Sequence, residues 1–459
     1  MAISRGRITQ WLERAPAGVL NGYAVFTAFA VYFCVYAFRK PFTAATYDGL
    51  QFAGTQIQLK TALVVSQLLG YTLAKYLGIK FVSEANRGRR LGMLLGLIAF
   101  AELALLLFAV APPAWKVVAI FLNGVPLGMV FGLVVRYLEG RRTSDILLAG
   151  LACSFIVSSG VFKDVGRALL AGDVIRFFGL PLPNPLPPLD EFWMPAATGL
   201  LILPAFLLAV WLLNQVPEPT PQDMADRTER EPMTGPRRRQ FLLAYLPGLL
   251  PLISAYVFLT VFRDYRDNYM VDVLDQLGYT YAQNKDIMSR MELGVALGVL
   301  ATMGLLYLIK NNRRGLLAIL AAVAAGFFII GMATLLHMAG AISGFWWVAL
   351  IGFGGYLAYV PYNSVLFDRL MASTHFVGTA VFAIYLADSA GYTGSCIIQI
   401  GKDVLAAQTS RTQFLEYFSL FLSVVGTLTV AAGGIYFWRL GRTPPANNAE
   451  GTLIDANLR

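Results

Sequence analysis

Residues 91–110 read LGMLLGLIAFAELALLLFAV, an apolar run that contains a single charge, Glu102. A helix of about 20 residues, rising about 1.5 Å per residue, crosses the hydrocarbon core of a bilayer, which is about 30 Å thick. The run lacks the polar–apolar alternation of a membrane barrel strand. We therefore expect a transmembrane helix here.

Similar runs recur along the whole chain. Of its 459 residues, 57% are hydrophobic and only 14% are charged, which lies outside the range of soluble globular proteins. The sequence predicts an all-α polytopic membrane protein with twelve transmembrane helices. The expected spans are 18–46, 57–82, 91–112, 116–138, 145–170, 193–215, 240–265, 284–309, 315–338, 343–370, 375–402 and 412–438.

The segment between the sixth and seventh spans is polar, rich in proline and without apolar periodicity, which is typical of a linker. The chain then divides into two halves of six spans each. The expected divisions are an N-terminal segment 1–17, a first half 18–215, a linker 216–239, a second half 240–439 and a tail 440–459.

Corresponding spans of the two halves carry similar residues. Lys163-Asp164-Val165 ends the fifth span and Lys402-Asp403-Val404 ends the eleventh. Arg39 and Arg263 lie near the ends of the first and seventh. This pattern favours an internal duplication, which is common in transporters.

The formal net charge of +9 is best explained by membrane topology. Lys and Arg gather in alternate connections, and no nucleic-acid-binding motif accompanies them, so we expect no nucleic-acid partner. The pattern predicts a multi-pass protein of the cytoplasmic (inner) membrane, with both termini in the cytoplasm. The basic connections contain Arg5, Arg7, Arg14, Lys80, Arg87, Arg89, Arg90, Arg136, Arg141, Arg142, Arg227, Arg230, Arg237, Arg238, Arg239, Lys310, Arg313, Arg314, Arg439 and Arg442.

Metal and cofactor chemistry is not indicated. Cys34, Cys153 and Cys396 are scattered among predicted helices, and the chain has only two histidines. A nucleotide-binding Gly-x-x-x-x-Gly-Lys-Ser/Thr loop is missing from the sequence, so transport would draw on gradients. No nucleophile and base can be paired at membrane depth, so we expect no enzyme, no catalytic residues, no cofactor and no metal.

Six ionisable residues fall within or beside the predicted spans. At about 3 kcal/mol each on insertion scales, six uncompensated charges would cost roughly 18 kcal/mol. They must therefore be paired or hydrated, and a central aqueous cavity between the halves provides both. These residues are Arg39, Lys75, Glu102, Arg263, Glu292 and Asp388.

Arginine suits the capture of an anion because its planar guanidinium is permanently charged and donates two parallel hydrogen bonds. We expect Arg39 and Arg263, one from each half, to bind a bridging anion, with Lys75 as a third charge and Lys40 as an auxiliary. Two alternatives stay open. The pair Arg39-Lys40 can snorkel to the outer interface, and Arg263 can form a salt bridge with Asp264, Asp267 or Glu292.

The carboxylates have two interpretations. Glu292 and Asp388 are candidates for proton coupling, because a carboxylate in a low-dielectric cavity can bind a proton. Each can instead be the partner of an ion pair, and Asp264 and Asp267 share these two possible roles. Glu102, on a third helix expected at the periphery, is assigned a structural role.

Several short segments resemble the major facilitator superfamily, and within it the organophosphate:phosphate antiporters. Residues 36–42, YAFRKPF, are similar to that branch's first-helix Arg-Lys motif, and residues 70–75, GYTLAK, to its second-helix segment with a cavity lysine. Residues 121–128 resemble its Gly-rich fourth helix, and residues 291–294 its eighth-helix acidic position. The resemblance implies the twelve-helix major facilitator fold, with phosphate bound by Arg39 and Arg263 and Lys75 in the cavity.

These patterns together predict a secondary active transporter that works by alternating access. Its expected cargo is a small anionic solute, such as an organophosphate exchanged for phosphate, and its expected state in the bilayer is monomeric. Two other functions stay open. One is a proton-coupled carrier or exporter of a non-phosphorylated solute, and the other is a transporter-like receptor that binds a ligand without moving it.

Overall fold

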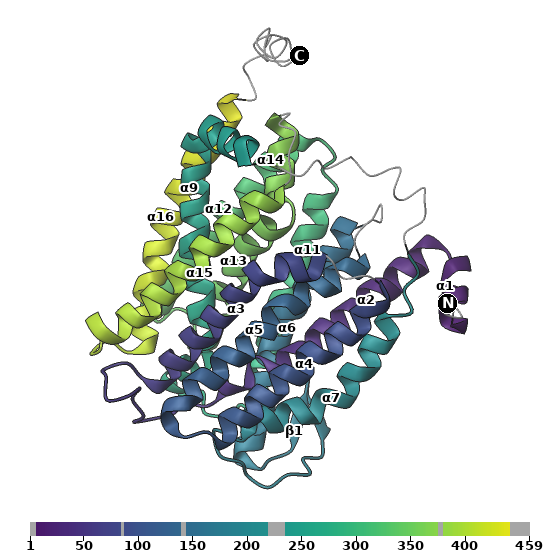
Figure 1. Ribbon diagram of the computed structural model, residues 1–459. Coiled ribbons are helices and arrows are strands. Elements are labelled where there is room, and N and C mark those ends of the chain that lie inside the picture. Colours follow the sequence, from purple (N-terminus) through teal and green to yellow (C-terminus); the bar gives the residue numbers. More distant parts are fainter. Residues whose placement is uncertain (1–5, 84–86, 139–143, 219–234, 375–379, 441–459) are drawn as a thin grey trace.

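The computed structural model describes residues 6–83, 87–138, 144–218, 235–374 and 380–440. Most of the expected linker and nearly all of the expected tail lie outside these residues, as does His375. The described chain forms a tilted bundle of long helices (Figure 1).

The first part of the chain supplies six of the long helices. They are α2 (Ala17–Val35), α3 (Leu59–Ser83), α4 (Arg87–Val110), α5 (Pro113–Leu138), α6 (Ser144–Ala171) and α7 (Met194–Leu213). Shorter elements accompany them: α1 (Arg7–Arg14), the 3-10 turns η1 (Tyr36–Phe38) and η2 (Pro41–Ala44), and the strands β1 (Ile175–Phe177) and β2 (Leu180–Leu182).

The later part supplies another six. They are α9 (Gly235–Asn268), α11 (Ile287–Tyr307), α12 (Asn312–Met338), α13 (Gly344–Ser364), α15 (Ala380–Leu405) and α16 (Arg411–Leu440), with the shorter α10 (Met270–Gln276) and α14 (Leu366–Thr374). These long helices confirm the all-α prediction. The exception is the antiparallel pair β1–β2, which was not expected and which pairs Ile175 with Leu182 between α6 and α7.

Length and composition suit a bilayer. Nine of the described helices are long and apolar enough to cross a membrane. The other long helices, α3, α6 and α15, have 25, 28 and 26 residues, and they carry many of the buried charges considered below. At about 1.5 Å per residue, each of them also exceeds the thickness of the hydrocarbon core.

The first expected span differs from the structure. A continuous helix over 18–46 is expected, but α2 ends at Val35, and two 3-10 turns follow it. Pro41 has no backbone N–H and so cannot donate the hydrogen bond that would continue the helix, although Lys40 before it keeps αR angles, with φ −103° and ψ −21°. Arg39 and Lys40 therefore lie between the two 3-10 turns, outside the regular helix.

Buried apolar side chains form two clusters, one mainly from residues 24–216 and the other mainly from residues 241–437. The two sets of helices meet where α3 packs against α15 and where α6 packs against α11. In Figure 1 helices α2, α4 and α7 lie on one side of the bundle, and α9, α12 and α16 lie on the other. We call these two sets the first and second halves.

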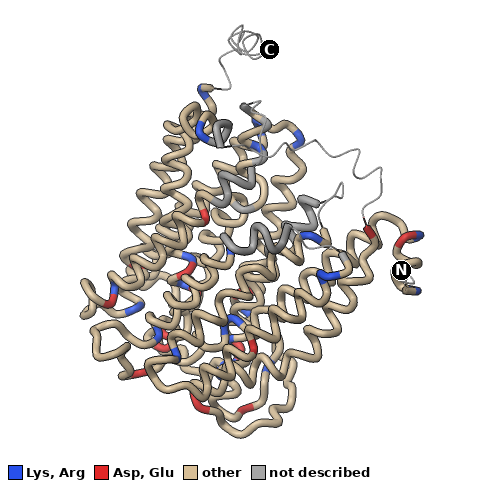
Figure 2. The backbone as a smooth tube through the Cα atoms, in the orientation of Figure 1, with Lys and Arg blue, Asp and Glu red and all other residues tan. Residues whose placement is uncertain are grey.

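Successive long helices run in opposite directions, so the bundle has two ends. We call the end where α2 finishes and α3, α11 and α16 begin the distal end, and the end where α2 begins and α16 finishes the terminal end. In Figure 2 many of the blue and red positions lie close together in the lower half of the picture, toward the distal end. The β1–β2 turn marks the same end in Figure 1.

Helices α3 and α5 pack unusually closely, because glycines remove the side chain at their crossing. A Cβ on Gly124 would lie 2.3 Å from the carbonyl oxygen of Gln67, and one on Gly70 would lie 2.2 Å from that of Phe121. Neither contact is possible without moving backbone. The first half therefore requires glycine at both positions.

We expect Gly124→Leu to lower the melting temperature of the purified protein, because overpacking costs about 1–3 kcal/mol even when the surrounding structure adjusts. Gly92 on α4, where an added Cβ meets nothing within 4 Å, provides the control variant Gly92→Leu. Thermal unfolding in detergent measures both. Equal melting temperatures for the two variants would contradict the close crossing.

Candidate functional site

The break after α2 is held by side chains of two neighbouring helices. Gln67 on α3 donates to the carbonyl oxygen of Arg39 at 3.0 Å and to the side-chain oxygen of Asn123 at 2.8 Å. Asn123, fully buried on α5, donates to the carbonyl oxygen of Phe38 at 3.0 Å. Carbonyl groups freed by the break are thus satisfied, and Arg39 is held at a fixed place.

The side chain of Arg39 is surrounded by tyrosine. Its guanidinium carbon lies 4.5 Å from the centroid of the Tyr71 ring and 5.3 Å from that of Tyr36, whose hydroxyl accepts a hydrogen bond from Nη1 at 3.3 Å. Its Nε is buried and has no hydrogen-bond partner. Among the residues that the structure describes, no carboxylate forms an ion pair with Arg39.

Lys75 links the two halves. Its ammonium group forms an ion pair with Asp388 of α15, and Asp388 also accepts a hydrogen bond from the hydroxyl of Tyr256. The same ammonium group lies 4.6 Å from the centroid of the Tyr392 ring and 5.5 Å from that of Tyr71. The Lys75 side chain keeps 20% of its surface exposed, which indicates contact with water deep in the bundle.

Arg263 occupies the equivalent place in the second half. Its Nη2 lies 2.5 Å from the carboxylate of the adjacent Asp264, and its guanidinium lies 4.1 Å from the centroid of the Tyr359 ring. Its side chain is 15% exposed. Contacts between rings connect the surroundings of the two arginines: Tyr71 lies 5.8 Å from Tyr392, and Tyr359 stacks on Tyr256, whose hydroxyl donates to Asp388.

We call this group the central cluster. Three cations and two carboxylates lie at the interface of the halves. Two of the cations are paired with the carboxylates, and aromatic rings lie beside all three cations. Its members are Arg39, Lys75, Arg263, Asp264 and Asp388, with the rings of Tyr36, Tyr71, Tyr256, Tyr359 and Tyr392. Three of the four expected substrate-binding residues, Arg39, Lys75 and Arg263, therefore lie in one group.

The fourth, Lys40, lies elsewhere. Its Nζ is 2.5 Å from the carboxylate of Asp267 and donates to the side-chain oxygen of Asn268 at 2.7 Å. Lys163 of α6, whose side chain has no exposed surface, lies 2.6 Å from the same carboxylate, and the hydroxyl of Ser159 also donates to it. One carboxylate of the second half thus holds two lysines of the first.

Further ion pairs between the two halves lie near Lys40, Asp267 and Lys163 at the distal end. Lys60 pairs with Asp272 at 2.5 Å, and Arg167 pairs with Asp275 at 3.0 Å. In the pair Lys285–Asp173 the lysine comes from the second half and the carboxylate from the first. The hydrogen bond from Lys285 lowers the pKa of Asp173, which lies outside the membrane spans. We call these four groups the distal network: Lys40–Asp267–Lys163, Lys60–Asp272, Arg167–Asp275 and Lys285–Asp173.

The two Lys-Asp-Val sequences have equivalent contacts. Asp164 accepts a hydrogen bond from the backbone N–H of Ser289 at 2.7 Å, in the first turn of α11. Asp403 accepts one from the backbone N–H of Gln58 at 3.1 Å, just before α3 begins. Each carboxylate thus binds the N-terminus of a helix in the opposite half, where the helix dipole favours negative charge. Sequence reasoning noted the repeat but not these contacts.

Glu292 lies on α11 where this helix packs against Gly160 of α6, and its ion-pair partner belongs to the same half. Its carboxylate pairs with Arg266 at 2.8 Å, and Arg266 also donates to the carbonyl oxygen of Val348 at 3.0 and 3.2 Å. The structure therefore places Glu292 as an ion-pair partner. Glu102 is buried between α4 and α7, where its carboxylate faces Gly199.

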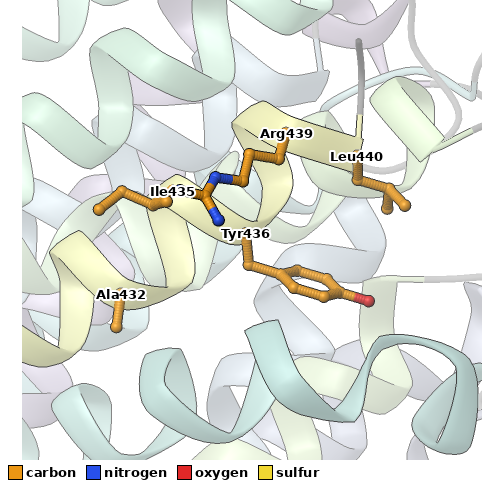
Figure 3. A pocket seen from close by; sticks show the side chains of 5 residues that line it. All are labelled: Ala432, Ile435, Tyr436, Arg439 and Leu440. Atoms are coloured by element: carbon orange, nitrogen blue, oxygen red, sulfur yellow. The ribbon is translucent and has the colours of Figure 1, made fainter. Parts of the chain in front are cut away.

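The surface hollow in Figure 3 is separate from both groups. Its five lining residues, which are Ala432, Ile435, Tyr436, Arg439 and Leu440, all come from the last turns of α16. A hollow formed by one helix on the outside of the bundle has no access to the interface of the halves, and we assign it no role.

Two solved structures have the same fold as this chain. The crystal structure of a D-xylose-proton symporter matches with a TM-score of 0.54 and 15% identity, over 92% of this chain and 99% of that one. The human organic anion transporter MFSD10 (TETRAN) matches with a TM-score of 0.53 and 14% identity, over 91% of this chain and 100% of that one. The comparison with curated proteins gave no match.

These likenesses confirm the major facilitator fold and an integral, multi-pass membrane protein. These two structures do not support membership of the organophosphate:phosphate antiporter branch. Residues 41–440 match the model of a family described as "Family of unknown function (DUF5690)", and the chain therefore belongs to that family.

Proposed function

We propose that this protein is a secondary active transporter that moves a small organic anion by alternating access, with the anion held at the central cluster. The observation that carries the proposal is Arg39, an arginine deep in the bundle with a buried, unpartnered Nε and no ion-pair partner among the described residues. An uncompensated charge at such a place costs several kcal/mol. A bound anion would remove that cost.

The distal network supports the alternating-access part of the proposal. Its ion pairs join the first half to the second at one end of the bundle, while the central cluster lies deeper. Closing one end with polar contacts, rather than with a continuous apolar core, allows the two halves to separate and rejoin. The two similar structures are those of a D-xylose-proton symporter and an organic anion transporter, which agrees with transport.

Three finer predictions belong to this proposal. The resemblance of residues 36–42 implies one candidate cargo among the organic anions, an organophosphate exchanged for phosphate. The protein lies in the cytoplasmic membrane as a monomer, with both termini in the cytoplasm. The distal end then faces outward, so the described conformation would be closed to the outside.

Binding tests the proposal directly. A ligand at about 100 times its dissociation constant stabilises a protein by about 2.7 kcal/mol. We expect one or more organic anions to raise the melting temperature of the wild type but not that of Arg39→Gln. Arg176→Gln, the same change at an exposed residue of β1, should respond like the wild type. Equal stabilisation of Arg39→Gln and wild type would refute the role of Arg39.

A further inference from the structure

We infer that the central cluster accepts a single negative charge carried on a flat organic body, which makes its cargo a monoanionic, ring-bearing organic acid. This inference rests on the proposed function and narrows its cargo. It departs from the phosphate ester that the sequence resemblance implies.

The first argument is the balance of charge. Lys75 is paired with Asp388, and Arg263 is paired with Asp264, so only Arg39 is left without a counter-ion among the described residues. The central cluster thus offers one net positive charge to a ligand. The ammonium groups of Lys40 and Lys163 add no free donor, because both are buried against Asp267 in the distal network.

The second argument concerns the negative charge of the ligand. A carboxylate carries one negative charge, whereas a phosphate monoester carries about −1.5 to −2 at pH 7. The additional charge would meet Asp264 and Asp388, which already occupy the other two cations. Like charges at short range in a partly dry site repel strongly. The arrangement therefore favours a monoanion.

The third argument is the set of aromatic rings beside the cations. Each cation lies over a tyrosine ring: Arg39 at 4.5 Å from Tyr71, Arg263 at 4.1 Å from Tyr359 and Lys75 at 4.6 Å from Tyr392. The ring of Tyr359 also stacks on that of Tyr256, with centroids 5.4 Å apart and planes 17° from parallel.

Aromatic rings beside a cation favour a flat ligand. A guanidinium that is stacked on a ring keeps the N–H groups at its edge free to bind a carboxylate. The neighbouring ring faces then favour a second flat, apolar group by offset or edge-to-face contact. A small hydrated anion without a ring gains nothing from these surfaces. The aromatic rings of the central cluster therefore favour a ligand that carries a flat ring.

Four probe compounds separate charge from shape. Benzoate carries one charge and a ring, phthalate and phenyl phosphate carry a ring with more charge, and acetate carries one charge without a ring. We expect the purified wild type to bind benzoate about tenfold or more tightly than each of the others, a difference of about 1.4 kcal/mol, by isothermal titration at pH 8.

A charge-changing variant makes the test independent of ring chemistry. Asp388→Asn removes one negative charge from the central cluster, so it should raise the affinity for phthalate and phenyl phosphate relative to benzoate by about tenfold. Asp48→Asn, the same change in an exposed turn, should leave the order of affinities as in the wild type.

The outcomes distinguish the inference from the proposed function. If the dianions or acetate bind the wild type as tightly as benzoate, and Arg39→Gln abolishes this binding, the inference is wrong while the proposed function stands. If the order in Asp388→Asn equals that in the wild type, the charge argument is wrong. If anions bind equally to wild type and Arg39→Gln, the proposed function fails as well.

Discussion

Asp267→Asn is expected to open the distal end of the protein. The substitution leaves two buried ammonium groups, those of Lys40 and Lys163, without their shared carboxylate. Removing one partner from a buried ion pair costs about 3–5 kcal/mol. Conformations of a two-state protein commonly differ by only a few kcal/mol, so this loss should make the distally closed state the minor one.

Pulsed spin-label distances measure this change. Labels on Gln56→Cys and Gln413→Cys report on the distal end, because both side chains are exposed there and the neighbouring Gln58 and Arg411 are hydrogen-bonded at 2.5 Å. In the Asp267→Asn background the distance distribution should shift to longer values. An unchanged distribution in a folded protein would show that the Asp267 contacts do not hold the distal end closed.

Two other carboxylates provide a graded control. The side chain of Asp272 is 15% exposed in its pair with Lys60, and that of Asp275 is 37% exposed in its pair with Arg167. Exposed ion pairs contribute about 0–1 kcal/mol, because water and salt screen them. We therefore expect Asp275→Asn to shift the distances least. Asp272→Asn should shift them less than Asp267→Asn does, because Asp272 pairs with one lysine and Asp267 with two.

Glu292→Gln should cause the largest loss of folding stability. Its carboxylate is 1% exposed and its partner Arg266 is 3% exposed, so the change leaves a buried guanidinium with hydrogen bonds to Val348 alone. The expected cost is again about 3–5 kcal/mol. Because both partners belong to the second half, the pair does not join the two halves, and the distal distances of the folded fraction should remain those of the wild type.

The double variant Arg266→Met with Glu292→Leu distinguishes a structural ion pair from a proton carrier. Replacing a buried pair with apolar residues of similar volume is often neutral or stabilising. We expect the double variant to recover most of the melting temperature lost in Glu292→Gln, and to retain binding of the anion. Recovery of stability together with loss of proton-dependent flux would instead assign Glu292 to coupling.

Much of the helical layout was predictable, because apolar run length determines what can cross a bilayer. The first span and the span 343–370 were exceptions, because α2 ends at Val35 and because α13 ends at Ser364 before α14 begins at Leu366. Pro41 was visible in the sequence, but the 3-10 turns on both sides of Arg39 depend on hydrogen bonds from Gln67 and Asn123, which come from other helices.

The site was predictable in part. An arginine inside an apolar stretch is a strong signal, and Arg39, Lys75 and Arg263 do lie in one group. The partner of each charge was not predictable, because Lys75–Asp388 and Lys163–Asp267 join residues that are 313 and 104 positions apart. The repeated Lys-Asp-Val sequence was the one local signal for the cross-half contacts of Asp164 and Asp403.

The central claim is that Arg39 holds an anion that this protein moves across the membrane. The most direct measurement is exchange of a radiolabelled anion, one that binds the purified protein, in proteoliposomes that contain wild type, Arg39→Gln or Arg176→Gln. We predict saturable flux for wild type and Arg176→Gln, and at least a tenfold loss for Arg39→Gln, or about 1.4 kcal/mol. Binding at Arg39 without flux in wild type would contradict the claim and indicate a receptor.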